Sequence, residues 1–145
     1  MNYTFKEISI KYESRWNKLL YSSLYPFYRQ SFAAEYLKES RGREVKSFIF
    51  QLNGADIAGV HYSIKRSKFN LLSTADVLSG IVLKDEPTID LLDYIINHFI
   101  SFAKSNKIAF IRITPWLPKL IAGQNTGYEL LINQVLFNNG FEIFN

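Results

Sequence analysis

Residues 45–65, VKSFIFQLNGADIAGVHYSIK, decide the fold class of this 145-residue chain. A largely apolar run from Val45 to Leu52 leads into Asn53-Gly54, and a second such run extends from Ile57 to Lys65. Asn and Gly both tolerate the positive φ angles of a tight two-residue turn. The stretch therefore predicts an antiparallel β-hairpin, with the rest of the fold built around it.

Upstream of the hairpin, the pattern predicts one strand and two helices. Alternating apolar and polar residues favour a strand over Phe5–Ile10. A helix is expected from about Ser14, and Pro26 separates it from a second helix over Gln30–Glu39. The inward face of the first helix is expected to hold Trp16, Leu19 and Leu20. The inward face of the second is expected to hold Ala33, Tyr36 and Leu37.

Downstream of the hairpin, extended segments are predicted over Phe69–Ser73 and Val77–Leu83. A long helix then begins near Thr88, because apolar residues recur at the three-and-four spacing of a buried face. These residues are Leu92, Ile95, Ile96, Phe99, Phe102 and Ala103. The short apolar run Ile108–Ile113 is typical of a central strand covered on both faces.

The last part of the chain predicts a helix over Tyr128–Phe137 and a strand over Phe141–Phe144. Strands that alternate with helices favour crossover connections and a partly parallel sheet. We therefore expect a single α/β domain over residues 1–145, with a mixed central sheet flanked by helices.

The composition fits a folded, soluble protein and excludes several kinds of site. Hydrophobic residues make up 48% of the chain, and the absence of cysteine excludes disulfides, thiolate metal sites and a cysteine nucleophile. The chain does not start with a signal-peptide pattern, and no apolar run approaches the roughly 20 residues of a spanning helix. A cytoplasmic location is therefore expected. The net charge of +4 is scattered, which argues against a DNA partner, and the distant His61 and His98 predict no metal site.

Several short patterns, taken in order, carry a resemblance to a known family. They are Trp16-Asn17 with Leu19-Leu20, Phe27–Ser31, Asn53–Gly59, Ser79–Leu83, Phe110–Pro115 and Asn139–Phe141. Their order resembles the fold of the GNAT superfamily of acyltransferases and, within it, the FemAB family. Members of that family transfer amino acids from aminoacyl-tRNA to a peptidoglycan precursor, and they contain two GNAT-like halves. The chain resembles the first half over nearly its whole length.

The resemblance implies a binding site for a UDP-linked or lipid-linked muropeptide acceptor. Lys38 matches a lysine that contacts the phosphates of the precursor. Thr114 stands where the family has a carboxylate in its Arg-x-Asp-Pro segment, and Ala109 stands where it has a tyrosine. These departures imply a retained scaffold with altered ligand chemistry. The aminoacyl-tRNA donor would be bound through a second half, which has no counterpart here.

The basic residues near the second predicted helix leave two interpretations open. Lys38, Arg29, Arg41 and Arg43 could hold a diphosphate, because Arg offers a bidentate fork and Lys a point charge. The alternative, favoured for the three arginines, is a solvated basic face of the helix, whereas the family resemblance supports a binding role for Lys38.

Two residues near the end of the predicted strand 108–113 also carry alternatives. Arg112 lies in an apolar run, where a charge either faces a ligand or pairs with a carboxylate such as Asp76 or Asp85. Trp116 follows the carboxyl end of the strand, the usual ligand side of an open α/β sheet. Its ring could stack on a sugar or a base, or it could belong to the core or a lid.

The sequence argues against acetyl-CoA, and no other cofactor is predicted. An ordinary CoA-dependent GNAT enzyme needs a glycine-rich turn at the start of its long helix, where backbone N–H groups hold the pyrophosphate. The corresponding segment Leu83–Thr88 has no glycine, and it carries the carboxylates of Asp85 and Glu86.

Three functions remain open at this point, and whether the chain is an enzyme is one of the open questions. The first is an acyl- or aminoacyl-transferase domain of peptidoglycan precursor synthesis, which binds the acceptor and is completed by a second half. The second is a non-catalytic binding or assembly module that covers an exposed sheet edge by forming a homodimer. The third is an N-acyltransferase of polysaccharide assembly. No catalytic residue is predicted for any of them.

Overall fold

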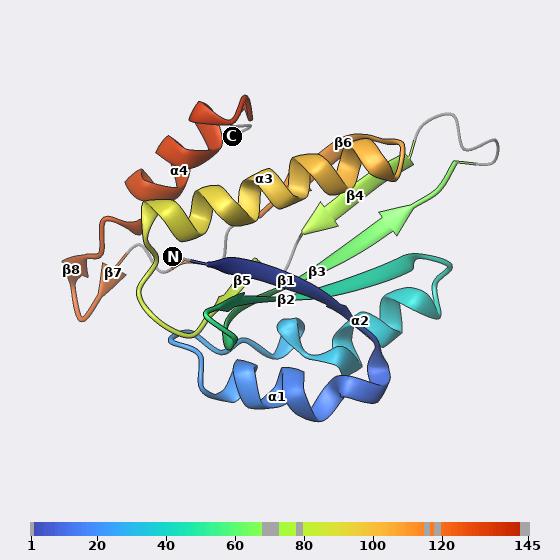
Figure 1. Ribbon diagram of the computed structural model, residues 1–145, viewed down its shortest axis with the longest axis horizontal. Helices are drawn as coiled ribbons and strands as arrows, with labels where there is room; N and C mark the ends of the chain where they lie inside the picture. Colours follow the sequence, from blue (N-terminus) through green and yellow to red (C-terminus); the bar gives the residue numbers. More distant parts are fainter. Residues whose placement is uncertain (1, 68–72, 78–79, 115–116, 118–119, 143–145) are drawn as a thin grey trace.

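The computed structural model describes residues 2–67, 73–77, 80–114, 117 and 120–142. These residues form one mixed sheet with helices on both faces (Figure 1). The order of the paired strands is β1-β2-β3-β4-β6, and the short β5 also pairs with β3. The expected α/β class with a mixed central sheet is confirmed.

The predicted hairpin is the centre of the sheet. β2 (Glu44–Leu52) and β3 (Ala55–Lys65) pair antiparallel around Asn53 and Gly54, whose φ angles are 50° and 84°. Positive φ at both positions is the backbone of a tight primed turn, as predicted. A bulge between Phe50 and Gln51 shifts the strand register by one residue on the side away from the turn.

β1 (Tyr3–Ile8) forms the edge of the sheet beside β2 and pairs with it antiparallel. It begins two residues earlier than predicted and ends at Ile8, because the chain then enters a 3₁₀ turn, η1 (Ile10–Tyr12).

The two extended segments predicted after the hairpin have different bounds in the structure. The strands are β4 (Ser73–Val77) and β5 (Ile81–Leu83), whereas residues 69–72 lie outside the described part of the chain. Gly80, with φ of 72°, precedes β5, and the two strands pair with different parts of β3. The prediction of one continuous strand over Val77–Leu83 was therefore wrong, because it took no account of the break at Gly80.

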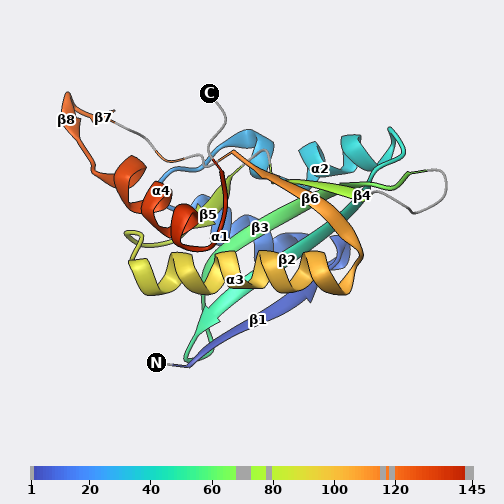
Figure 2. The same cartoon turned by 90° about the horizontal axis from the view of Figure 1, so that it is seen from above.

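The connection from β4 to β6 (Ile108–Ile113) is the predicted crossover. These two strands are parallel. The chain between them includes α3 (Ile89–Ser105), which lies on one face of the sheet (Figures 1 and 2). The apolar stripe predicted for this helix is buried, with Leu92, Ile95, Ile96 and Phe99 fully covered and Phe102 and Ala103 partly covered. No described helix is long and apolar enough to cross a membrane.

The opposite face of the sheet is covered by α1 (Glu13–Tyr21) and α2 (Phe32–Glu39), which follows the 3₁₀ turn η2 (Tyr28–Gln30). Trp16, Leu19 and Leu20 face inward as predicted. The inward face predicted for the second helix was wrong, because Ala33, Tyr36 and Leu37 are exposed. The ring of Phe32 packs edge-on against Trp16 at 5.6 Å, and this contact turns Phe32 and Glu35 toward the sheet instead.

β6 differs from the predicted central strand. Among the described residues it pairs on one side only, with β4, and α3 covers one of its faces. On the other face of β6, which α1 and α2 do not reach, Phe110 is 50% exposed and the Arg112 side chain is 58% exposed. The short apolar run indicated a strand correctly, but it could not show that the strand lies at the edge of the described sheet.

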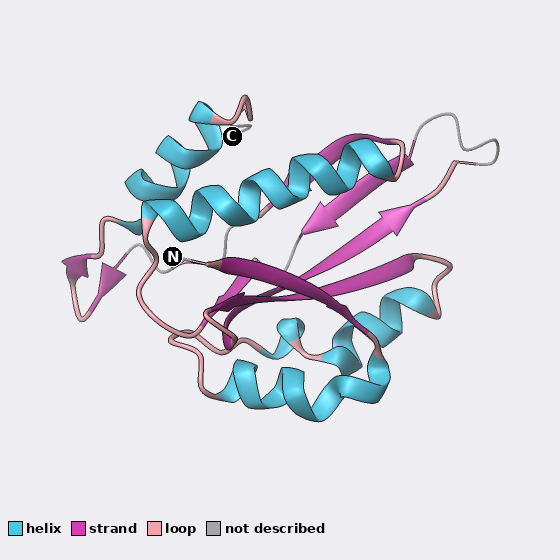
Figure 3. Cartoon of the chain, in the orientation of Figure 1, coloured by secondary structure: helices cyan, strands magenta, loops and turns pink. Residues whose placement is uncertain are grey.

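The remaining described elements are one helix and a short hairpin. α4 (Tyr128–Asn138) packs against α3, close to the predicted bounds, and β7 (Leu120–Ile121) and β8 (Gln124–Asn125) form a small separate hairpin (Figure 3). Phe141 and Glu142 are not part of a strand, and the rest of the predicted strand Phe141–Phe144 lies outside the described residues.

Candidate functional site

The strand register places five polar or charged residues in one line across the face of the sheet that bears α1 and α2. Ser47 on β2 is opposite His61 on β3, Ser63 on β3 is opposite Asp76 on β4, and Asp76 is beside Arg112 on β6. Residues opposite one another share a face of the sheet, as do residues two apart on one strand. We call Ser47, His61, Ser63, Asp76 and Arg112 the polar row.

Asp76 is the centre of the open end of the polar row. Its carboxylate is 5% exposed and accepts hydrogen bonds from two guanidinium groups. Arg43 Nη1 donates to Asp76 Oδ2 at 2.6 Å and to Ser63 Oγ at 3.3 Å, and Arg112 Nε donates to Asp76 Oδ1 at 3.0 Å. Two positive charges on one buried carboxylate leave the group with a net charge of +1.

This geometry answers the question that the sequence left open for Arg112. The guanidinium pairs with Asp76, and 58% of its side chain nevertheless remains exposed. A guanidinium carries five N–H donors in a fixed fork, so the orienting bond through Nε is compatible with binding a carboxylate or phosphate. Arg112 is therefore a fixed cation at the open face of β6.

At the other end of the row, His61 is a structural residue. Its Nε2 donates to the carbonyl oxygen of Gln30 at 3.1 Å, so Nδ1 accepts from the Ser47 hydroxyl at 2.6 Å. The same carbonyl accepts from Trp16 Nε1 at 2.7 Å. Burial lowers the pKa of His61 to about 3, so the ring is neutral near pH 7 and holds η2 against the sheet. The described residues contain no group of three His, Asp or Glu side chains that could hold a metal ion.

Lys38 lies in the last turn of α2 and is held by an acidic neighbour. Its Nζ donates to Glu35 Oε1 at 2.5 Å, and Glu35 is 1% exposed. Burial raises the pKa of Glu35, and the Lys38 ammonium opposes that shift. The positive charge of Lys38 also contributes to the low pKa of His61, after the larger effect of burial.

The other predicted site residues lie apart from these contacts or beyond the described region. Arg29 is exposed on η2, where its Nε donates to the Tyr28 hydroxyl at 2.9 Å, and no described contact joins it to the polar row. Thr114 is exposed at the carboxyl end of β6, and its N–H donates to the carbonyl oxygen of Val77 at 3.0 Å. Trp116 lies outside the described residues.

Glu35, Ser47 and Ser63 were missed by reasoning from the sequence. Ser47 and Ser63 are small polar residues in otherwise apolar strands, which is a weak signal of a polar face. Glu35 gave no usable signal, because the sequence pattern placed it on the exposed side of its helix.

At the start of α3, the segment for which the sequence argues against CoA, two features reduce the capacity to bind a phosphate. The N-cap Thr88 uses its side chain to accept from Leu91 N at 3.3 Å, and Pro87 has no N–H to offer. Asp85 and Glu86 are exposed carboxylates in the same segment. A helix start binds phosphate through free N–H groups and positive potential, and both are reduced here.

Comparisons with known proteins identify the fold. The chain matches the structure of FemX at 17% identity with a TM-score of 0.71, over 94% of this chain and 32% of that chain. It also matches ribosomal-protein-alanine N-acetyltransferase from Brucella melitensis biovar Abortus 2308 at 15% identity and TM-score 0.64, over 100% and 94% of the two chains. For glucosamine-6-phosphate N-acetyltransferase from Arabidopsis thaliana the identity is 10% and the TM-score 0.58, over 100% and 95%. The fold is therefore that of the GNAT acetyltransferases.

Other comparisons returned nothing. No protein-family model matches the sequence, and a search of curated proteins found no relative. At 10–17% identity, the three structural matches bear on the fold alone.

Proposed function

We propose that this chain is an acyl- or aminoacyl-transferase-type domain of peptidoglycan precursor synthesis, and that its role is to bind the acidic acceptor. The observation that carries the proposal is the pair Arg43 and Arg112, both held on the buried Asp76, with Arg112 at the exposed face of β6. The GNAT-type fold, and the match of 94% of this chain to a part of FemX, support it.

The acceptor in this proposal is a UDP-linked or lipid-linked muropeptide, whose diphosphate and carboxylates are anionic. Arg112 would take one of these groups, because its guanidinium is both oriented and exposed. Lys38 would contribute positive potential rather than a direct contact, since its ammonium is engaged by Glu35. Thr114, at the same end of β6, can offer a hydroxyl but no charge.

The donor in this proposal is an aminoacyl-tRNA, bound through a second GNAT-like half, and the carboxylates and the proline before α3 argue against acetyl-CoA. Residues 1–145 would then correspond to the first half of a FemAB-type protein. Such a reaction needs an amine to be held against an activated ester, so positioning would contribute most of the rate. His61 would take no part as a base for the substrate, since it is buried and both of its nitrogens are bonded.

Calorimetric titration with UDP-linked muramyl-pentapeptide tests the proposal. We expect saturable binding that Arg112→Ala weakens by about tenfold or more, because a hydrogen bond to a charged group contributes about 1.5–3 kcal/mol. Arg66→Ala is the matched control, since Arg66 also pairs with a single carboxylate, that of Glu44, at 3.0 Å. Arg112→Ala should leave the protein folded, because Arg43 still neutralises Asp76.

Three results would count against parts of the proposal. Absence of binding by the folded wild-type protein would remove the acceptor site. Equal weakening by Arg112→Ala and Arg66→Ala would mean that only overall charge matters. Saturable binding of acetyl-CoA in a parallel titration would overturn the donor assignment and favour an N-acyltransferase of polysaccharide assembly.

A non-catalytic binding or assembly module is the second candidate, and the exposure of β6 favours it. Among the described residues this strand has a partner on one side only, and Phe110 is 50% exposed on it. Exposed strand edges with apolar side chains favour pairing with another strand. Light scattering after size-exclusion chromatography would then give a homodimer that Phe110→Lys dissociates, and a wild-type monomer would exclude this form of the candidate.

A further inference from the structure

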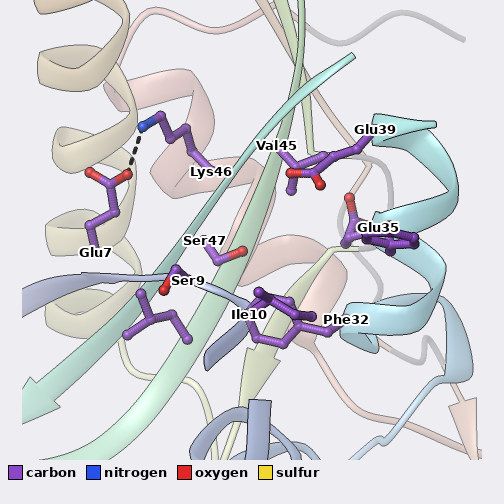
Figure 4. A pocket seen from close by; sticks show the side chains of 11 residues that line it. Glu7, Ser9, Ile10, Phe32, Glu35, Glu39, Val45, Lys46 and Ser47 are labelled. Atoms are coloured by element: carbon purple, nitrogen blue, oxygen red, sulfur yellow. Dashed lines mark hydrogen bonds and ion pairs between the residues drawn. The ribbon is translucent and has the colours of Figure 1, made fainter. Parts of the chain in front are cut away.

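A pocket lies at the β1 edge of the sheet, opposite the edge formed by β6. It has a volume of about 260 Å³ and is enclosed by the end of β1, the helix α2 and the start of β2 (Figure 4). The lining residues that matter below are Ile8, Phe32, Glu35, Glu39, Lys46 and Ser47. We call this space the α2 pocket.

The α2 pocket is acidic, although the chain as a whole carries a net charge of +4. Its lining contains the carboxylates of Glu7, Glu35 and Glu39 and one ammonium, that of Lys46. Lys46 pairs with Glu7 at 2.8 Å, and Lys38, beside the lining, pairs with Glu35 at 2.5 Å. With Lys38 counted, three negative and two positive charges leave a net charge of −1, which belongs to Glu39.

One carboxylate oxygen of Glu35 lacks a hydrogen-bond donor among the described residues. The residue is 1% exposed, and its Oε1 takes the bond from Lys38. Its Oε2 is buried and has no hydrogen-bond partner among the described residues. A buried acceptor without a partner is costly, because it has lost its bonds to water. The carboxylate of Glu39, which Figure 4 shows beside Glu35 on the same wall, adds repulsion rather than relief.

The remaining walls indicate what kind of donor the α2 pocket would accept. Ile8 and the ring of Phe32 are buried apolar groups, and Val45 lies opposite α2 (Figure 4). The volume corresponds to about nine water molecules at roughly 30 Å³ each. A short alkyl chain with one charged end therefore matches both the size and the polarity of the space, whereas a hydrated anion does not.

We propose that the α2 pocket binds a primary alkylammonium group, whose N–H groups supply the donor that Glu35 Oε2 lacks. Glu39 provides a second carboxylate at the mouth of the pocket, and the apolar walls contact the alkyl chain. The ammonium belongs either to a free amine or to a lysine side chain of a peptide, because both present the same group. The α2 pocket lies on the β1 and β2 side of the sheet and the exposed Arg112 of the proposed acceptor site on the β6 side, whereas Ser47 and the Lys38–Glu35 pair lie between them.

Titration with n-butylammonium, followed by amide ¹H–¹⁵N shifts, tests the inference without any precursor or nucleotide present. We expect saturable shifts centred on Phe32 and Ser47 and none with 1-butanol, which has the same length but no charge. Glu39→Gln should weaken binding several-fold, and Glu35→Gln should weaken it by about tenfold or more, as for loss of a charge-assisted bond. Asp85→Asn, an exposed acidic residue outside the pocket, should leave the binding unchanged.

The two sources of the ammonium are separated by a second titration with an acetylated, amidated lysine peptide. Tighter binding of the peptide than of n-butylammonium assigns a lysine side chain, and the reverse assigns a free amine. Equal shifts with 1-butanol, or shifts that spread over the surface, would overturn the inference. So would unchanged binding in Glu39→Gln, which alters an exposed residue and is therefore expected to fold even if Glu35→Gln does not.

Discussion

Gly59 on β3 offers the sharpest test of how α1 is held on the sheet. A Cβ atom at this position would lie 2.7 Å from Cζ3 and 2.8 Å from Cη2 of Trp16, and 3.1 Å from Cδ2 of Leu19. The Trp16 side chain has little room to move away, because it is fully buried and its Nε1 donates a hydrogen bond to the Gln30 carbonyl oxygen at 2.7 Å. Its ring also lies 3.9 Å from the ring of His61. Gly59→Ala should therefore strain the packing of α1 on β3.

Two opposing effects set the magnitude for Gly59→Ala. Overpacking a well-filled core by one methyl group costs about 1–3 kcal/mol. Replacing glycine restricts the unfolded chain, which returns about 0.4–1 kcal/mol. The net expected loss in the free energy of unfolding is about 1–2 kcal/mol. For a chain of this size that corresponds to a fall in Tm of roughly 3–6 °C.

A double-mutant cycle isolates the contact from other effects of the substitution. Urea unfolding would be followed by far-ultraviolet circular dichroism for the wild type, Gly59→Ala, Trp16→Phe and the double variant. The smaller phenylalanine ring leaves room for the added methyl group, so Gly59→Ala should cost about 1 kcal/mol less in the Trp16→Phe background. An equal cost in both backgrounds, or a stabilising Gly59→Ala, would refute the reasoning.

Three further predictions concern acid stability, a helix cap and the polar row. Burial lowers the pKa of His61 to about 3 and that of His98 to about 4 in the folded protein. As the pH falls below about 6.5, these histidines take up protons in the unfolded chain before they do so in the folded protein, and the free energy of unfolding decreases. Each histidine should lower the free energy of unfolding by about 2 kcal/mol between pH 7 and pH 5. Urea unfolding at both pH values should show that His98→Gln loses less of this free energy than the wild type. An equal loss in the variant and the wild type would contradict the lowered pKa of His98. Thr88→Ala removes the N-cap of α3 and should lower the free energy of unfolding by about 1 kcal/mol, whereas Thr88→Ser should not. Asp76→Asn should lower the free energy of unfolding by about 1–3 kcal/mol. Arg112→Ala should lower it by less, because the carboxylate of Asp76 is buried whereas the Arg112 side chain is largely exposed. The opposite order of the two variants in thermal unfolding would exclude Asp76 as the centre of the polar row.

The sequence was sufficient wherever a structure depends on neighbouring residues. Asn53-Gly54 determined the turn of the central hairpin, because both residues adopt positive φ angles. The start of α3 at Thr88 and its buried face followed from capping and from the spacing of apolar residues. The parallel pairing of β4 and β6 follows from the helix between them, which makes the connection a crossover.

The candidate site was predicted only in part. Arg112 was named with Asp76 as one of two possible partners, and the structure joins them at 3.0 Å. Lys38 was named as well, but its buried partner Glu35 was not, because the phase of α2 is set by the contact of Phe32 with Trp16. A helix of eight residues has too few apolar positions to reveal its buried face from spacing.

The polar row itself depends on the tertiary structure. Counting pairs from the turn at Asn53-Gly54 would place Ser47 opposite Val60, whereas the bulge at Phe50 and Gln51 places it opposite His61. One residue of register exchanges the two faces of a strand, so the bulge decides that a histidine rather than a valine joins the row. Local preferences act over a few residues, but the contacts of the row join residues 14 to 36 positions apart. Those contacts form only when the packing of α1 and α2 against the sheet has fixed the register of its strands.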